Sequence, residues 1–156
     1  MSGGSAHMTA DVDEGLRARL LGYQFPTGTC TVPAHESWLG HQAMRAPLGA
    51  VEELNPLWPV IIGMRGMGVS IADLGKLVEM GPGDSVMFGE LEIEQVAPLT
   101  IDNEYTIDGI ITDITRHHGR TAGTFDIVTF VLTLTDPCGE TVATVTNSFV
   151  FIRRQQ

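Results

Sequence analysis

The chain has 156 residues, 43% of them hydrophobic, a length at which a protein usually forms one domain around a single core. Asp and Glu outnumber Lys and Arg by 19 to 9, for a net charge of −10, which disfavours binding to nucleic-acid phosphates. No apolar run approaches the ~20 residues of a membrane-spanning helix. We therefore expect neither nucleic acid nor a membrane as a partner.

Residues 1–8 are small and polar and end in a second methionine, a pattern typical of an expression-tag remnant rather than of a signal peptide with an apolar middle. We expect residues 9–156 to form the single domain. Cys30 and Cys138 form neither a CxxC pair nor a Cys/His zinc spacing. This cysteine usage predicts a reducing, cytoplasmic location and no metal.

The first half of the chain predicts one strand and one helix. Residues 20–32 mix aromatic and β-branched residues with Gly, Pro and Thr, which favours a short strand. A polar, histidine-rich stretch follows. From Met67 to Met80 apolar residues recur at steps of three and four, the period of a helix that buries one face. The run Gly81-Pro82-Gly83 should end this helix.

The second half predicts four strands, in runs rich in Val, Ile, Thr and Phe at 86–97, 104–115, 124–135 and 140–152. Residues 136–139 have the composition of a hairpin turn, and the polar residues 116–123 suggest a longer connection. A helix between a first strand and four consecutive strands indicates an α+β fold. We expect an antiparallel sheet curled around the central helix, the architecture of the hotdog fold.

The segment Glu36-Ser37-Trp38-Leu39-Gly40-His41 places an acidic residue and a histidine five residues apart, and Ala46 follows. With two further segments, it makes the chain resemble the MaoC-like dehydratase and hydratase family, whose motif has an Asp and a His at this spacing around an Asn-Pro pair, with an alanine further on. Arg65-Gly66-Met67 resembles the His-Gly-Met step before the family's central helix, and Pro82-Gly83-Asp84 resembles its Pro-Gly-Asp turn. The sequence departs from the motif at Glu36, Trp38-Leu39 and Arg65.

A second register would place the motif on residues 53–58, which include Asn55-Pro56. In that register the histidine is Trp58, and few residues remain before Gly66. The first register is therefore preferred, and the resemblance spans residues 20–152.

The resemblance implies a hydratase or dehydratase that acts on enoyl or 3-hydroxyacyl thioesters of CoA or acyl carrier protein, without a cofactor. It implies that Glu36 and His41 share a catalytic water as an acid–base pair. It also implies that Gly66, flanked by Arg65 and Met67, binds the thioester oxygen through N–H groups at the start of the helix. The alternative for Gly66 is close packing of the helix.

Arg116-His117-His118-Gly119-Arg120 is the densest basic cluster of this acidic chain. Arg116 and Arg120 are candidates for binding a phosphate of CoA or phosphopantetheine; the alternative is a solvated hairpin tip. Two other functions remain open. One is a hotdog thioesterase with Asp73 on the central helix as its acid, and the other is a non-catalytic partner in a heteromeric MaoC-like dehydratase. An uncovered sheet edge predicts a homodimer, or a heterodimer with another hotdog chain.

Overall fold

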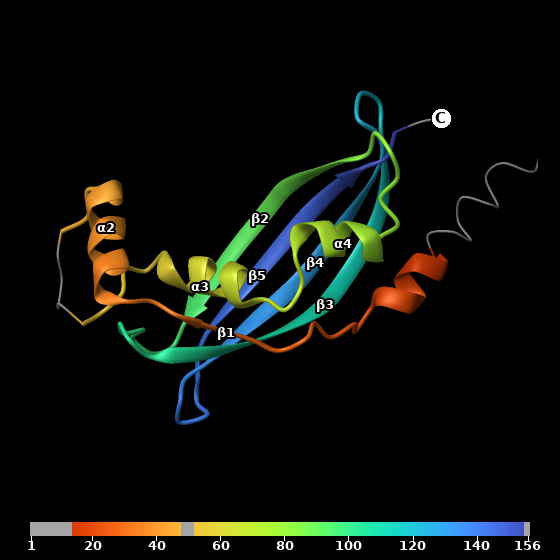
Figure 1. Cartoon of the computed structure of the whole chain (residues 1–156). Coiled ribbons are helices and arrows are strands. Elements are labelled where there is room, and N and C mark those ends of the chain that lie inside the picture. Colours follow the sequence, from red (N-terminus) through yellow and green to blue (C-terminus); the bar gives the residue numbers. More distant parts are fainter. Residues whose placement is uncertain (1–13, 48–51, 155–156) are drawn as a thin grey trace, which may run out of the picture.

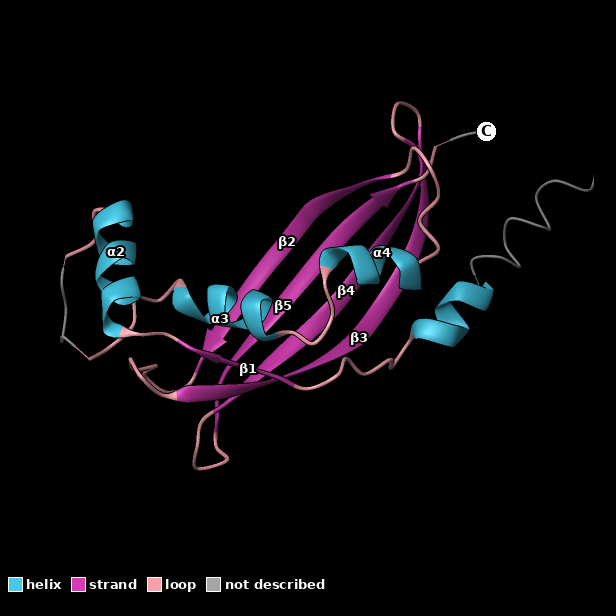
Figure 2. Cartoon of the chain, in the orientation of Figure 1, coloured by secondary structure: helices cyan, strands magenta, loops and turns pink. Residues whose placement is uncertain are grey.

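The computed structural model describes residues 14–47 and 52–154, so the expected tag remnant at 1–8 lies outside the described residues. A five-stranded antiparallel sheet in the order β1-β3-β4-β5-β2 carries the helices α3 and α4 across one face, and α2 stands beyond its end (Figures 1 and 2). Residues 14–20 form a further short helix. The elements in chain order are β1 (Gly28–Thr31), α2 (Ala34–Met44), α3 (Trp58–Gly66), α4 (Ile71–Leu77), β2 (Ser85–Gln95), β3 (Glu104–Gly119), β4 (Gly123–Thr135) and β5 (Thr141–Ile152).

The four strands predicted for the second half are confirmed as β2 to β5. Burial alternates along β4, because successive side chains of a strand point to opposite faces, and Phe130 and Leu132 join the core beneath the helices. Of the strand predicted at 20–32, only β1 is formed. The long connection predicted at 116–123 is also wrong, because Arg116 pairs with Asp126 in the β3–β4 ladder and the strands continue to Gly119 and Gly123.

Of the central helix predicted from Met67 to Met80, only Ile71–Leu77 is helical, as α4, and a separate helix, α3, precedes it. α3 ends at Gly66, and α4 begins at Ile71 after the N-cap Ser70. Between them the chain passes close to Pro26, since a Cβ on Gly68 would lie 1.7 Å from the Pro26 carbonyl oxygen. The segment between α3 and α4 therefore packs against the segment that leads into β1. The predicted α+β fold, with the sheet wrapped around central helical structure, is confirmed.

A buried ion network closes the end of the sheet that carries the β3–β4 hairpin. Asp126 is fully buried and accepts two hydrogen bonds from Arg116, at 2.6 and 2.8 Å, and one from Arg153 at 2.8 Å. Arg153 also donates to Asp84 and to the carbonyl oxygens of Val78 and Glu79 after α4. We call Asp126, Arg116, Arg153 and Asp84 the Asp126 network. It joins β3, β4, the end of β5 and the turn before β2.

Two glycines allow α3 to touch β1, and their replacement should be costly. A Cβ on Gly28 would lie 1.8 Å from the Gly66 carbonyl oxygen, which is backbone and cannot move aside cheaply. We expect Gly28→Ala to lower the free energy of unfolding by about 3 kcal/mol, the upper end for overpacking, measured by urea denaturation. Gly15→Ala is the matched control, because Gly15 lies in the helical turn 14–20 with no atom within 4 Å of its added Cβ.

The control should be neutral or raise stability by up to about 1 kcal/mol, since alanine favours a helix over glycine. Equal stability of Gly28→Ala and the parent protein would contradict the close contact between α3 and β1.

Candidate functional site

The polar, histidine-rich stretch before α3 is not a loop but the helix α2, which carries both predicted catalytic residues. Five residues along an α-helix correspond to a rotation of about 140° beyond a full turn, so Glu36 and His41 lie on different faces of α2. His41 is buried, whereas Glu36 is partly exposed. The structure does not bring these two side chains together, although their spacing in the sequence matches the family motif.

Glu36 instead pairs with the arginine that ends α3. Its Oε2 accepts a hydrogen bond of 2.5 Å from Nη1 of Arg65, and the Arg65 guanidinium carbon lies 5.8 Å from the ring centroid of Trp58. The hydrogen bond to Glu36 raises the pKa of Arg65 above its ordinary value. We refer to Cys30, Glu36, Trp58 and Arg65 as the α2–α3 junction; His41 lies on another face of α2.

The Cys30 thiol belongs to this junction but is not prepared to act as a nucleophile. Burial raises its pKa, and the nearby charge of Arg65, which acts in the opposite direction, does not overcome this effect. A cysteine needs its thiolate form to attack a thioester. The Cys30 thiol therefore stays protonated at neutral pH and does not suit covalent catalysis.

His41 has a defined tautomer. Its Nδ1 lies 2.8 Å from the backbone carbonyl oxygen of Ser37, one turn earlier in α2. A carbonyl oxygen can only accept a hydrogen bond, so Nδ1 must carry the proton. In the neutral ring the lone pair is then on Nε2, which is the arrangement that a general base requires.

Trp58 places a buried donor at the junction. It begins α3, its side chain is 3% exposed, and its Nε1 has no hydrogen-bond partner among the described residues. A Cβ on Gly40 would lie 3.0 Å from the indole ring, so α2 packs directly on this side chain. Trp58 is in the core, whereas Trp38 is half exposed. No pattern in the sequence indicated the unpaired indole N–H of Trp58.

Gly66 does not stand at the start of a helix, as the sequence suggested, but is the last residue of α3. The Met67 N–H donates to the Gly63 carbonyl oxygen at 2.8 Å, so it is occupied within the helix end. The close-packing alternative for Gly66 agrees with its contact with β1.

In the second register of the motif, residues 53–58, Asn55 forms a turn in which its Oδ1 accepts the Leu57 N–H at 3.0 Å.

Asp73 is part of the N-terminal cap of α4 rather than of the α2–α3 junction. It exchanges hydrogen bonds with Ser70 in a capping box and pairs with Lys76 at 3.0 Å. The hydrogen bond from Lys76, followed by those from Ser70, lowers the pKa of its carboxyl group. In Figure 1, α4 and α2 lie on opposite sides of α3. The predicted thioesterase acid is therefore occupied in stabilising a helix end.

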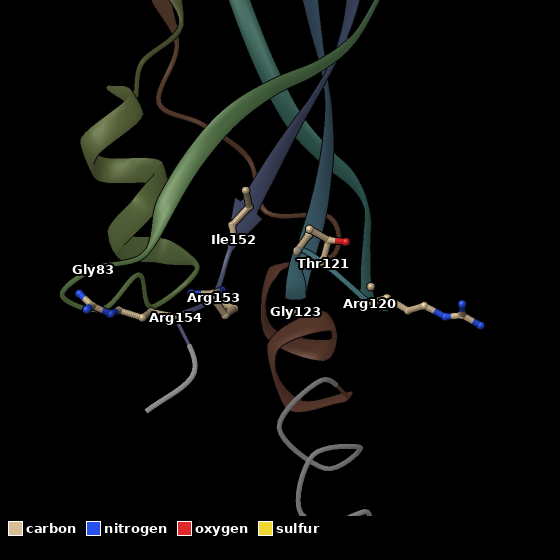
Figure 3. Close-up of a pocket in the computed structure, with 9 residues that line it drawn as sticks. Gly83, Arg120, Thr121, Gly123, Ile152, Arg153 and Arg154 are labelled. Atoms are coloured by element: carbon tan, nitrogen blue, oxygen red, sulfur yellow. The ribbon is translucent and has the colours of Figure 1, made fainter.

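The two arginines predicted to bind phosphate have different environments. Arg116 is bound to Asp126 within the sheet, with its side chain only 11% exposed. Arg120 lies in the exposed loop between β3 and β4 (Figure 3). This hairpin is at the end of the sheet opposite α2 (Figure 1), so it does not adjoin the α2–α3 junction of the same chain.

Within the described ranges, no group of three or more His, Cys, Asp or Glu side chains could hold a metal ion. In the same ranges, no helix is long and apolar enough to span a membrane.

Comparison with solved structures places this arrangement in a known fold. The chain is similar to a chain of the ChsH1-ChsH2 complex from Mycobacterium tuberculosis, with a TM-score of 0.72, 11% identity and coverage of 97% of this chain and 96% of that one. It is also similar to the MaoC-like dehydratase from Rhodospirillum rubrum, with a TM-score of 0.58, 19% identity and coverage of 87% and 94%. A third similar structure is the (R)-hydratase from A. caviae, with a TM-score of 0.50, 15% identity and coverage of 83% and 94%.

These likenesses show that the chain has the hotdog fold, in the form that MaoC-like dehydratases also have. No protein-family model matches the sequence, and comparison with curated proteins by sequence finds no match. The resemblance suggested by the sequence motifs is thus confirmed at the level of the fold.

Proposed function

We propose that the chain acts in the hydration of an enoyl thioester, or the reverse dehydration of a 3-hydroxyacyl thioester, with the acyl group carried on CoA or an acyl carrier protein. The observation that supports this proposal is that α2 carries a base, His41, and on another face contacts the hydrogen-bond donors of the α2–α3 junction. His41 offers a base with a fixed tautomer, and Trp58 and Arg65 offer hydrogen-bond donors. Hydration needs a base for water and donors for the negative charge that develops on the thioester oxygen.

In this proposal Nε2 of His41 takes a proton from water while the water oxygen bonds to the β carbon. The electron pair of the double bond moves toward the thioester oxygen, where Arg65 and the Trp58 N–H stabilise it. The proton then passes from His41 to the α carbon, which restores the neutral imidazole. Glu36 is a positioning residue, because it holds the Arg65 guanidinium and is not directed at the same water as His41.

A direct assay tests the proposal. A short trans-2-enoyl-CoA and a saturated acyl-CoA of equal chain length are offered separately to the full chain, and enoyl absorbance and free thiol are followed. We expect loss of enoyl absorbance without release of thiol. Release of thiol from the saturated substrate would instead favour the thioesterase, and no turnover of either would count against an independent enzyme.

A second candidate is a non-catalytic partner subunit of a heteromeric dehydratase. One observation favours it, namely that Glu36 and His41 lie on different faces of α2 and Glu36 is paired with Arg65. An acid and a base that do not meet cannot share one water, so a second hotdog chain would then supply the acid–base pair. This candidate expects no activity from the chain alone, and activity when the partner is added.

Both candidates predict an oligomer. The edge strand β2 exposes the apolar side chains of Met87, Phe88 and Leu91, each at least 40% accessible, and an edge strand offers unpaired backbone groups to another chain. We expect light scattering at micromolar concentration to give the mass of a dimer or a higher oligomer, as a homodimer or together with another hotdog chain. A stable mass of one chain in the absence of a partner protein would contradict the homodimer.

A further inference from the structure

A second concave site lies at the end of the sheet farthest from α2. The loop 119–123, Gly83 and residues 152–154 line a pocket of about 470 Å³, which Figure 3 shows in close-up. That volume lies within the range of small-molecule sites. The α2–α3 junction is at the opposite end of the same chain (Figure 1), so the two sites are separate.

The Asp126 network gives this pocket a fixed wall. The Arg153 side chain is held by Asp126 and Asp84, and the backbone N–H of Arg154 donates to Oδ1 of Asp84 at 2.7 Å. Gly83 has a positive φ of 88°, and a Cβ there would lie 2.5 Å from Cδ of Arg154. The turn before β2 thus packs closely against the Arg154 side chain, and the pocket is preorganised from three chain segments.

The charges of this pocket differ from those of the rest of the protein. The chain has nine Lys and Arg residues, and six of them form ion pairs, namely Arg17, Arg19, Arg65, Lys76, Arg116 and Arg153. The other three, Arg45, Arg120 and Arg154, have no ion pair with any described residue. Two of these three line the pocket. In a protein of net charge −10, two arginines without an ion pair to a described residue therefore line one small pocket.

We propose that this pocket, which is separate from the α2–α3 junction, binds a small ligand through a phosphate group. Arg120 and Arg154 line the pocket and extend in opposite directions (Figure 3), so binding of one anion by both requires their exposed side chains to turn toward the pocket. A phosphate has enough oxygen atoms to accept paired hydrogen bonds from two guanidinium groups at once. A carboxylate has only two oxygen atoms and binds two arginines less well. Arg153, already neutralised by carboxylates, shapes the wall rather than supplying the charge.

Isothermal calorimetry with pyrophosphate as the probe tests this proposal on the full chain. We expect saturable binding that weakens by about tenfold or more in Arg120→Ala and in Arg154→Ala, since each removes a charge-assisted donor. Arg45→Ala is the matched control because Arg45 is also exposed and unpaired but lies at the end of α2. It should leave the affinity within about twofold, and acetate should bind much more weakly than pyrophosphate.

Two results would overturn the proposal: no heat of binding at millimolar pyrophosphate, or equal weakening by all three arginine substitutions, which would indicate only general attraction. A parallel titration with CoA separates the sources of the phosphate. Competition between CoA and pyrophosphate would assign the phosphate to the nucleotide end of CoA, and binding of pyrophosphate without competition would assign it to another phosphorylated molecule. Because calorimetry needs no turnover, failure of the hydratase proposal would leave this result unaffected.

Discussion

Replacing Asp126 with Asn should lower the free energy of unfolding by about 3–5 kcal/mol, the range for breaking a buried ion pair by removing one partner. The substitution keeps the size of the side chain but removes its charge. Arg116 and Arg153, whose side chains are only 11% and 14% exposed, would then remain largely buried without a full counter-charge. Since a domain is stabilised by only about 5–15 kcal/mol in total, this single change should remove a large part of the stability.

Asp113→Asn is the matched control for this experiment. Asp113 also pairs with an arginine, Arg17, but both side chains are nearly half exposed, and such pairs contribute about 0–1 kcal/mol. Urea denaturation of both variants should therefore give clearly different midpoints at similar slopes. Equal loss in the two variants would mean that the Asp126 network is no more stabilising than a surface pair.

The same network should make the protein sensitive to acid. Burial acts to raise the pKa of Asp126, but the hydrogen bonds and charges of Arg116 and Arg153 outweigh it, and the pKa lies below its ordinary value. A carboxyl group with a lowered pKa in the folded state stabilises the protein above its unfolded pKa of about 3.9, and this stabilisation is lost as the pH falls toward the folded value. The difference in stability between the parent protein and Asp126→Asn should therefore be full at neutral pH and shrink below about pH 4.

If the chain is a hydratase, His41→Gln should reduce kcat by about a hundredfold to ten-thousandfold, the contribution of one general acid–base group. The loss follows from the removal of Nε2 as the base. Because His41 is buried, His41→Ala would also leave a cavity, so Gln, which is closer in volume, is the better variant. The measurement is the rate of enoyl-CoA hydration, with the melting temperature recorded for each variant.

His35→Gln is the matched control, since His35 is exposed on the same helix. It should leave kcat unchanged. Glu36→Gln should have a smaller effect than His41→Gln, because Glu36 positions Arg65 and does not contact the water in this proposal. A loss for Glu36→Gln as large as that for His41→Gln, with no further loss in the double variant, would instead support an acid and base acting as one unit.

Much of the sheet could be predicted because alternating burial and β-branched residues are local signals. The runs that became β2 to β5 all contain β-branched residues, and burial alternates along β3 and β4, although β2 is mostly exposed. Asp136 marks the last hairpin turn, where its Oδ1 accepts the N–H groups of Cys138 and Glu140. These features depend on neighbours in the sequence and on one buried face. The order of elements, and with it the fold, followed from them.

The helices and the site were harder to predict because tertiary contacts determine them. The helical period from Met67 onward could not reveal that Gly68 packs against Pro26, and the helix begins only at Ile71. The motif spacing predicts that Glu36 and His41 act on one water, which two side chains five residues apart can do in an irregular segment. Once that segment is helical, the same five-residue spacing separates them, and a residue distant in sequence, Arg65, becomes the partner of Glu36.

The exposed edge strand β2 also limits which chains can pair with it. Glu92 and Glu94 lie opposite Thr146 and Thr144 of β5, on the face away from the buried residues of that strand, and Glu90 is exposed beside them. Antiparallel pairing of two identical β2 strands would bring these carboxylates near their own copies, and like charges across a strand pair are destabilising. Self-association through β2 should therefore strengthen as ionic strength rises and screens the repulsion. A different chain with lysine or arginine on its edge would pair best at low salt, so β2 discriminates between an identical and a non-identical neighbour.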